Sequence, residues 1–478
     1  MDPRDTPGRP VASPHPSLSR LDVVAIIVGL VIGAGIFKAP AIVAANVGSE
    51  WSLLAVWAIG GAVSLAGALC YAELASAYPS AGGEYHFLTR AYGRRVAFLF
   101  AWSRLAILQT GSIALLAFVL GDYLAQLAPL DGYGAALYAA VSVIALTGLN
   151  IIGLRTSTTL QNVMTVVTLA GLLFVVVAGL GHAPVQAPSS EPVPASGDAA
   201  FGLAMVFVLL TFGGWNESAY VSAELRDVRR NMVRVLVTSL GVITLVYLLV
   251  NVAYLNVLGL EGMRGSEVVT ADVMRYAAGD LGAGLVSALI AVAVAASINV
   301  SILTGARTNY AMANDFPLLG FLAGWSGTAN APKNALLVQG AIALALVAVG
   351  ATARSGFETM VSYVSPIFWF FFLLATVSLF VLRRREPRHP RPFRVPFYPF
   401  TPLLFTLTCA YMLYSSLAYT GFGALLGVAV LGMGVPLLYF VNRAPSGDSA
   451  AASGDKEVPH AIGTRAAVRA GNPARPRG

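Results

Sequence analysis

The amino-acid sequence predicts an all-α membrane protein with twelve transmembrane helices. Of its 478 residues, 57% are apolar and only 11% are charged, less than half of the roughly 25% that is usual in soluble domains. Apolar runs of about 20 residues, the length that crosses a ~30 Å hydrocarbon core, make up most of the chain. Since so few charges cannot cover a water-exposed surface, lipid is expected to be the main solvent.

The predicted spans form two sets of five, followed by a final pair. The first set is 21–46, 52–78, 96–121, 133–152 and 157–180. The second set is 200–222, 233–257, 279–312, 334–351 and 357–382, and the final pair is 401–419 and 422–442. We interpret residues 21–180 and 200–382 as two five-helix repeats, joined by the proline-containing loop 181–199 and followed by the segment 383–442.

The distribution of Lys and Arg predicts that both termini are cytoplasmic. Alternate connections and the two tails hold 25 of the 30 basic residues, in the segments 1–20, 79–95, 153–156, 223–234, 307–333, 383–400 and 443–478. Cytoplasmic loops carry such an excess. Residues 1–20 are expected to be a cytoplasmic tail. The tail 443–478 is expected to be disordered, because it has too few apolar residues to form a packed structure. The predicted location is the plasma membrane.

Glycines interrupt the first span near the middle of the membrane. The run from Ile32 to Phe37 reads IGAGIF and is followed by Lys38 and Pro40. Glycine destabilises a helix by about 1 kcal/mol relative to alanine, and proline by about 3. An unwound segment frees backbone N–H groups that need partners in a dry environment. A bound solute can be that partner, although small residues also allow neighbouring helices to pack closely.

The sixth span repeats this feature at a similar depth, in the run from Phe212 to Asn216, FGGWN. Matching breaks in corresponding spans are typical of secondary transporters, in which the substrate lies where the broken helices meet. Helix N-termini favour an anionic group, and unwound carbonyls favour a cationic one. The pattern therefore predicts a shared site for a zwitterion.

The residues around these breaks resemble the L-type amino acid transporters of the amino acid, polyamine and organocation superfamily. The motifs that carry the resemblance are Val31 to Phe37 (VIGAGIF), Gly67 to Leu74 (GALCYAEL), Ser80 to Tyr85 (SAGGEY) and Gly213 to Asn216 (GGWN), followed by Glu224 and Arg230-Asn231. They occur in order over nearly the whole chain. The resemblance implies twelve helices in a five-plus-five inverted repeat, with helices 1 and 6 broken, and amino acid substrates.

Residue by residue, the resemblance implies a substrate site built mainly from backbone groups. The substrate carboxylate and ammonium would be held by Ile32, Gly33, Ala34, Gly35 and Ile36. Phe212, Gly213 and Asn216 would form the facing wall, and Trp215 would help to shape it. For the two aromatic residues, ordinary packing or an interfacial position is the alternative.

Three departures from the family pattern affect the expected mechanism. Where exchangers of the family often have a lysine in the fifth helix, this chain has Thr168, with Ser297 or Ser301 as possible fellow oxygens for a cation. Coupling to Na⁺ or protons is therefore an expectation beside exchange. Leu210 replaces the gating Phe of large-neutral members, which weakens the expectation of large aromatic substrates. The loop between spans three and four lacks a cysteine, so no disulfide-linked glycoprotein partner is expected.

Charged residues within spans are candidates for function, because charge is costly in the membrane. Lys38 either snorkels to the external surface or lies over the vestibule, where it would attract carboxylates. Arg104 is expected to pair with a carboxylate such as Glu73. Glu217 directly follows the second break. If it faces the vestibule, it would bind a cationic group of the substrate or a coupling proton. Otherwise it is only a counter-ion. The cytoplasmic charge cluster at 224–230 is either a solvated face or an inner gate.

Other classes of protein fit the sequence less well. The net charge of +7 is spread over loops and tails, so no nucleic acid partner is expected. Cys70 and Cys409 lie within apolar runs, and the sequence indicates no metal site. It has no phosphate-binding loop for ATP and no channel filter. Its histidines all fall in predicted tails or loops, so an intramembrane enzyme is not expected.

The sequence therefore predicts a secondary active transporter of neutral L-amino acids. It would work by alternating access, as an exchanger or an ion-coupled symporter, and without a cofactor. Two alternatives stay open. One is an amino acid sensor on the same fold, and the other is a transporter of cationic amino acids or polyamines.

Overall fold

The computed structural model describes residues 20–80, 82–130, 132–152, 158–182, 197–219, 225, 227–324, 332–353, 355–419 and 421–443. Every regular element among these residues is a helix, as predicted. The N-terminal tail, most of the loop 181–199 and residues 444–478 of the predicted disordered tail lie outside the described residues. Part of the charge cluster at 224–230, including Glu224, also lies outside them.

The helices before the loop follow the predicted spans to within two residues, except that the third ends at Leu127 instead of 121. The first predicted span is divided into α1 (Arg20–Val31) and α2 (Gly35–Ala45). The third contains a π-helical turn, η1, which marks a local bulge in a helix. The remaining elements are α3 (Glu50–Ala77), α5 (Arg94–Ser103), η1 (Arg104–Leu108), α6 (Gln109–Leu127), α7 (Gly134–Ile152) and α8 (Thr158–Gly181).

The helices after the loop also follow the predicted spans. They are α9 (Gly197–Thr211), α10 (Val228–Arg264), α11 (Val269–Asp315), α12 (Lys333–Ala351), α13 (Gly356–Arg385), α14 (Phe400–Tyr419) and α15 (Gly421–Arg443). Short 3-10 helices are η2 (Trp215–Ala219) and η3 (Pro317–Ala323). α10 and α11 exceed their predicted spans because helix continues past non-helical residues at Gly259 and Gly279.

One further helix lies in a connection between two predicted spans. α4 (Gly83–Tyr92) occupies most of the connection 79–95. Its buried residues Gly83, Glu84, Phe87, Leu88 and Ala91 recur at the three- and four-residue spacing of one helix face. The connection therefore packs against the bundle, and it carries a buried carboxyl group with it.

Ten of the described helical segments are long and apolar enough to cross a membrane. Two shorter apolar helices, Gly35–Ala45 and Val166–Gly181, belong to the first and fifth predicted spans. The most apolar window of Arg94–Leu127 is 67% buried within the molecule, whereas that of α7 is only 22% buried. The segment Arg94–Leu127 is therefore central in the bundle, whereas α7 is peripheral, with most of its surface free to face lipid.

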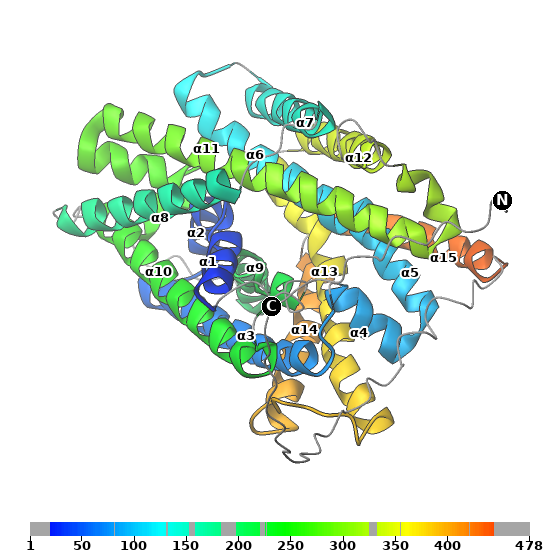
Figure 1. The fold of residues 1–478 in the computed structure, drawn as a ribbon. Coiled ribbons are helices and arrows are strands. Elements are labelled where there is room, and N and C mark those ends of the chain that lie inside the picture. The colour runs from blue at the N-terminus through cyan, green and yellow to red at the C-terminus, as the bar shows by residue number, and fades with distance from the viewer. Residues whose placement is uncertain are drawn as a thin grey trace, which may run out of the picture.

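The two interrupted spans lie beside each other inside the bundle (Figure 1). α1 packs on α10 and η2, and α2 packs on α9 and α10. α3 packs on α9 and α10, and α6 packs on α11. The breaks in the first and sixth spans are thus brought together by direct helix contacts.

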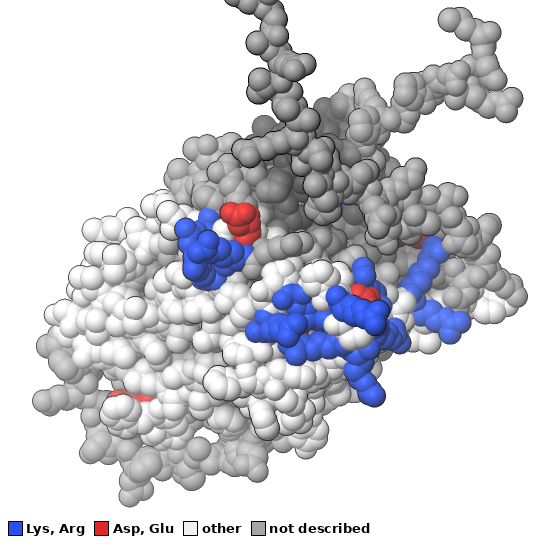
Figure 2. Space-filling model, turned by 60° about the horizontal axis from the view of Figure 1, so that its bottom comes forward, with Lys and Arg blue, Asp and Glu red and all other residues white. Residues whose placement is uncertain are grey.

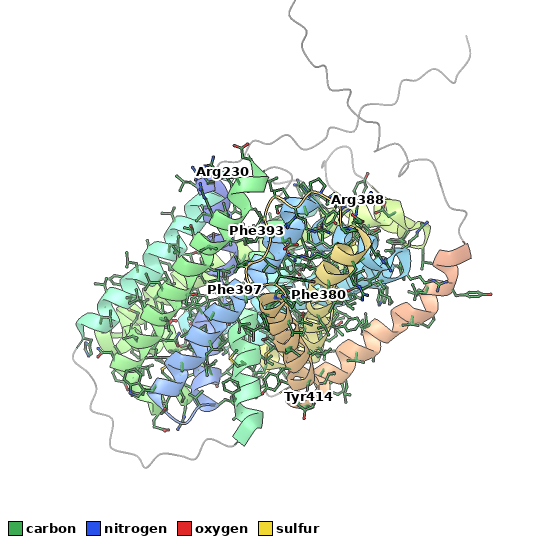
Figure 3. The ribbon with its side chains drawn as sticks, turned by 90° about the horizontal axis from the view of Figure 1, so that it is seen from below. Arg230, Phe380, Arg388, Phe393, Phe397 and Tyr414 are labelled. Atoms are coloured by element: carbon green, nitrogen blue, oxygen red, sulfur yellow. The ribbon has the colours of Figure 1, made fainter. Side chains whose placement is uncertain are left out.

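Basic side chains gather at one end of the bundle. Figure 3 places Arg230, at the start of α10, and Arg388, after α13, at the same end, and Tyr414 of α14 at the other. Figure 2 shows Lys and Arg in patches with few acidic side chains among them. Exposed arginines are dense in the segment after α13, which includes Arg388 and Arg394.

Candidate functional site

The first interruption separates α1 from α2 over Ile32, Gly33 and Ala34. The amide of Gly33 donates to the carbonyl of Val31 at 2.8 Å, which closes a tight turn. α2 then begins at Gly35. The first N–H groups of a helix have no acceptor within that helix, and they lie at the positive end of its dipole. The start of α2 therefore has the donors that bind a carboxylate.

The second interruption follows α9 and consists of a turn over 212–214 before η2. The amide of Gly213 donates to the carbonyl of Leu210 at 2.9 Å. Gly214 has a φ of 110°, in the region that favours glycine. Asn216 stabilises the turn, because its side-chain oxygen accepts from the amide of Gly214 at 3.2 Å. As predicted, neither break is crossed by continuous α-helix.

The two breaks touch each other at Gly35 and Thr211. A Cβ atom on Gly35 would lie 2.9 Å from both Cγ2 and Oγ1 of Thr211 and 3.2 Å from its Cα. These distances are shorter than normal van der Waals contact. Glycine at position 35 is therefore required for the start of α2 to lie against the end of α9.

Tyr247 of α10 joins the ends of α1 and α9, the two helices that lead into the breaks. Its hydroxyl donates to the carbonyl of Val31, the last residue of α1, at 2.7 Å, and lies 3.1 Å from the carbonyl of Thr211, the last residue of α9. The side chain is fully buried. The sequence analysis missed this residue, because one tyrosine in an apolar span looks the same as a packing residue.

The aromatic residues at the second break are packed among other rings. Phe212 is fully buried and contacts Trp57 and Tyr247, with ring centroids 6.1 and 5.0 Å away. Trp215 contacts Tyr71 at 5.1 Å, and also Phe372 and Phe405. These contacts match the packing alternative, and a direct role in substrate binding stays a prediction.

A pocket lies against the first break and brings together residues from three spans. Its lining includes Ile32, Gly33 and Ala34 together with Thr168 of α8 and Ser297 of α11. The expected neighbourhood of the two hydroxyl groups is therefore present. The described lining contains no residue of the second break.

Ser301 takes a different place from the other two hydroxyl candidates. It follows Ser297 by one helical turn, and its carbonyl accepts from the side chain of Gln109 at 2.7 Å. It is not among the described residues that line the pocket. The structure therefore groups Thr168 with Ser297 only.

Lys38 is held by an ion pair. Its Nζ atom lies 2.7 Å from Asp122 of α6 and donates to the carbonyl of Glu267 at 2.8 Å. The side chain is only 13% exposed, so most of it is covered by protein. Glu217 is not its partner, because that carboxylate lies beside Arg104.

Arg104 pairs with a carboxylate, as expected, but Glu73 as the example of that carboxylate is wrong. Arg104 pairs with Glu217, at 3.4 Å between Nη2 and Oε2. Glu73, near the end of α3, instead accepts from Nε of Arg383 at 2.7 Å and from the amide of Val395 at 2.7 Å. The segment after α13 folds over that end of α3 and supplies these donors, a contact between residues over 300 positions apart.

Glu84 is a buried carboxyl group that the sequence analysis did not single out. It lies on α4, which is not one of the membrane-spanning segments, and it is only 5% exposed. Its Oε1 accepts from the hydroxyl of Tyr71 at 2.6 Å and from Nδ2 of Asn216 at 3.2 Å. Burial raises the pKa of Glu84 above its ordinary value, although the hydrogen bond from Tyr71 opposes the shift.

Comparison with known proteins gives consistent matches over most of the chain. The family model for amino acid permeases matches residues 18–440. Asc-type amino acid transporter 1 of Mus musculus is 30% identical over 433 residues, which cover 87% of this chain and 79% of that protein. Large neutral amino acids transporter small subunit 2 of Homo sapiens is 30% identical over 436 residues, which cover 87% and 78%.

A bacterial relative matches over nearly its full length. The serine/threonine exchanger SteT of Bacillus subtilis (strain 168) is 27% identical over 432 residues, which cover 88% of this chain and 96% of that protein. These matches confirm the likeness to L-type transporters that the motifs around the two breaks indicated. Since the family match spans both breaks and the helices on either side, the chain belongs to the amino acid permease family.

Proposed function

We propose that this protein is a secondary active transporter that carries neutral L-amino acids across the membrane by alternating access. The meeting of the two interrupted helices carries the proposal: Gly35 lies against Thr211, and Tyr247 bonds the ends of both α1 and α9. The chain belongs to a family of transporters rather than enzymes. Relatives that are named as amino acid transporters and as an exchanger support the same function.

The proposed recognition uses backbone groups from Ile32 to Ile36. Amides at the start of α2 would bind the substrate carboxylate, because they combine free donors with the positive end of the helix dipole. Carbonyls released by the breaks would accept from the ammonium group. Gly213 and Asn216 would form the opposite wall, with Phe212 and Trp215 holding its shape through their ring contacts. Leu210 would limit the room for the side chain.

The charged groups near the breaks favour a neutral substrate over a cationic one. Glu217 has Arg104 as a partner, and Lys38 has Asp122. Glu84, beside the second break, is only 5% exposed and accepts two side-chain hydrogen bonds. A cationic side chain or a polyamine would need a carboxylate that is both accessible and unpaired. We therefore place cationic amino acids and polyamines behind neutral amino acids as substrates.

Two places in the structure are suited to ion coupling. The pocket at the first break offers the hydroxyl groups of Thr168 and Ser297 beside released carbonyls, as a Na⁺ site would, but its described lining contains no carboxylate. The second place holds Glu84, Glu217 and Arg104 beside the second break. Because a carboxylate can take up and release a proton, whereas the pocket has only neutral oxygens, we favour the proton.

We also propose a plasma-membrane protein with twelve helices in a five-plus-five inverted repeat and both termini in the cytoplasm. The two breaks at corresponding spans support the repeat, with the shorter helices Gly35–Ala45 and Val166–Gly181 completing the first and fifth spans. Arg230 and Arg388, which lie at the same end of the bundle (Figure 3), support the orientation. We assign this end to the cytoplasm.

Labelling of introduced cysteines tests this orientation. A membrane-impermeant maleimide is expected to label Glu50→Cys in intact cells, and to label Arg388→Cys only after the membrane is permeabilised. Both positions are exposed. The native Cys70 and Cys409 are buried, so the unmodified chain should give little background labelling. Labelling of Arg388→Cys in sealed cells would contradict the orientation.

Counterflow in proteoliposomes tests the transport function itself. Vesicles loaded with an unlabelled neutral amino acid are expected to accumulate the labelled form faster than empty vesicles, because a carrier returns faster with substrate bound. A sensor gives binding without counterflow. The purified chain is used without any other protein, so the same result tests whether a glycoprotein partner is needed. Counterflow with arginine or a polyamine, and none with neutral amino acids, would contradict the proposed substrate class.

A further inference from the structure

A cluster of charged groups lies directly beside the second break, and it joins four elements. Glu84 comes from α4, Tyr71 from α3, Arg104 from η1, and Asn216 and Glu217 from η2. Asn216 donates to Glu84 at 3.2 Å and accepts from the amide of Gly214 at 3.2 Å. One side chain thus connects a buried carboxyl group to the turn that forms the second break.

The charges in this cluster do not balance when both carboxyl groups are ionised. Among the described residues, two carboxylates, Glu84 and Glu217, would then face one guanidinium, that of Arg104, which leaves one negative charge. Glu217 is 37% exposed, whereas Arg104 is only 7% exposed and Glu84 only 5%. An unbalanced charge is costly where water is excluded, so the cost falls mainly on Glu84. A single proton restores neutrality.

The contacts of Arg104 with Glu217 are long enough for its positive charge to act on both carboxyl groups. Its distances to the two oxygens of Glu217 are 3.4 to 3.5 Å, longer than the 2.7–2.9 Å usual for a charge-assisted hydrogen bond. Arg104 is therefore not locked onto Glu217. The charges of both Arg104 and Glu217 also act on the pKa of Glu84, the first lowering and the second raising it.

We propose that Glu84 and Glu217, with Arg104 beside them, form the binding site for the one proton that drives amino acid uptake, and that Glu84 is the member that holds it. The inference rests on the proposed transport function and adds the coupling ion to it. A hydrogen bond to an ionised carboxylate is stronger than one to a neutral carboxyl group. Loss of the proton therefore strengthens the hydrogen bond from Asn216 to Glu84, and proton binding weakens it. The turn at the second break thus responds to the protonation state of Glu84.

The other charged groups on neighbouring elements have partners of their own. On α4 itself, Arg90 pairs with Glu386, and the pKa of His86 is lowered by burial and by Arg90. On α13, Arg383 pairs with Glu73. On α5, Arg94 donates to a carbonyl of Asp315. In the part of the chain that the structure describes, these interactions leave Tyr71, Arg104 and Glu217 as the titratable groups that face Glu84.

The test compares uptake by proteoliposomes with and without an inward proton gradient. For the unmodified protein, a neutral amino acid is expected to enter faster with the gradient. Glu84→Gln keeps an oxygen that accepts from Tyr71 and Asn216 but cannot bind the proton, so it should keep counterflow and lose the stimulation by the gradient. Glu50→Gln, the same change at an exposed position, should keep both. Stimulation that persists in Glu84→Gln would overturn the proposal.

Direct measurement of protons gives a second test that does not depend on uptake. A pH dye in weakly buffered detergent solution should report proton uptake when the unmodified protein binds the amino acid, and none for Glu84→Gln. Tyr71→Phe removes a hydrogen bond that lowers the pKa of Glu84, so the pH at which stimulation is half-maximal should rise. An unchanged midpoint would contradict the role of Glu84, even if Glu84→Gln did not fold.

The outcomes separate this proposal from the one on which it rests. If the unmodified protein shows no counterflow, the proposed transport function fails. The other outcome is counterflow without stimulation of uptake by a proton gradient and without proton uptake on substrate binding. In that case only the proton site fails, and the protein is an exchanger or uses another ion.

Discussion

Phenylalanine in place of Tyr247 is expected to weaken amino acid binding by about tenfold to hundredfold. The hydroxyl of Tyr247 satisfies the last carbonyl of α1 and lies within hydrogen-bond distance of the last carbonyl of α9. Without it, the carbonyl of Val31 is left with the amide of Gly33, and the carbonyl of Thr211 loses its contact with the hydroxyl. Loss of a partner by a buried acceptor costs about 1–3 kcal/mol, and each 1.4 kcal/mol corresponds to about tenfold in affinity. The substrate would then have to order two helix ends that the hydroxyl now holds in place.

Equilibrium binding of a labelled neutral amino acid to the purified protein measures this effect. The matched control is Tyr138→Phe, because Tyr138 also donates to a carbonyl, that of Ala128 at 2.8 Å, but this hydrogen bond is exposed. The control should bind as the unmodified protein does. If Tyr247→Phe bound equally well, Tyr247 would be a packing residue only, and the ends of α1 and α9 would need another explanation for their position.

The breaks could be predicted from the sequence because they depend on local chemistry. Glycine lowers helix stability wherever it stands. Two glycine-containing runs at similar depth are both explained by a shared binding site between broken helices. The contact between Gly35 and Thr211 could not be predicted in the same way. It joins residues in different spans, and nothing in either run identifies its partner.

The charged residues show the same limit more clearly. Arg104 was recognised as costly within a span. Glu73, the carboxylate expected beside it, instead pairs with Arg383, which follows Glu73 by over 300 residues. Glu217 fills that place because η2 follows the second break and holds its carboxylate 3.4 Å from Arg104. Composition can identify a charge that needs a partner, whereas only the packing of helices identifies the partner.

Glu84 was missed for a different reason. The connection 79–95 is short and contains three arginines, so it has the composition of a solvated cytoplasmic loop. Its apolar residues Phe87, Leu88 and Ala91 nevertheless form one face of a helix, which packs on the bundle and carries Glu84 inward. A search for helical spacing within the connections, as well as within the spans, would have found this signal.

Alanine in place of Gly35 is expected to abolish transport. The added methyl group would lie 2.9 Å from two side-chain atoms of Thr211 and 3.2 Å from its Cα, so α2 and α9 would have to move apart. Overpacking of this kind costs about 1–3 kcal/mol, and the displaced groups are those proposed to bind the substrate carboxylate. Counterflow in proteoliposomes measures the loss. Gly241→Ala is the control, since Gly241 lies on α10 with no atom within 4 Å of the added methyl group, and it should transport normally.

A second substitution at Thr211 separates this contact from a general loss of folding. Thr211→Ala removes Cγ2 and Oγ1, the two atoms that the methyl group at position 35 would meet first, and keeps the 3.2 Å approach to the Cα atom. The pair Gly35→Ala with Thr211→Ala is therefore expected to recover part of the transport that Gly35→Ala loses. Residues in contact show such non-additive effects, whereas distant residues do not. If the double variant were no better than Gly35→Ala, the defect would come from the backbone of the first break rather than from its contact with the second, and the two breaks would not act as one site.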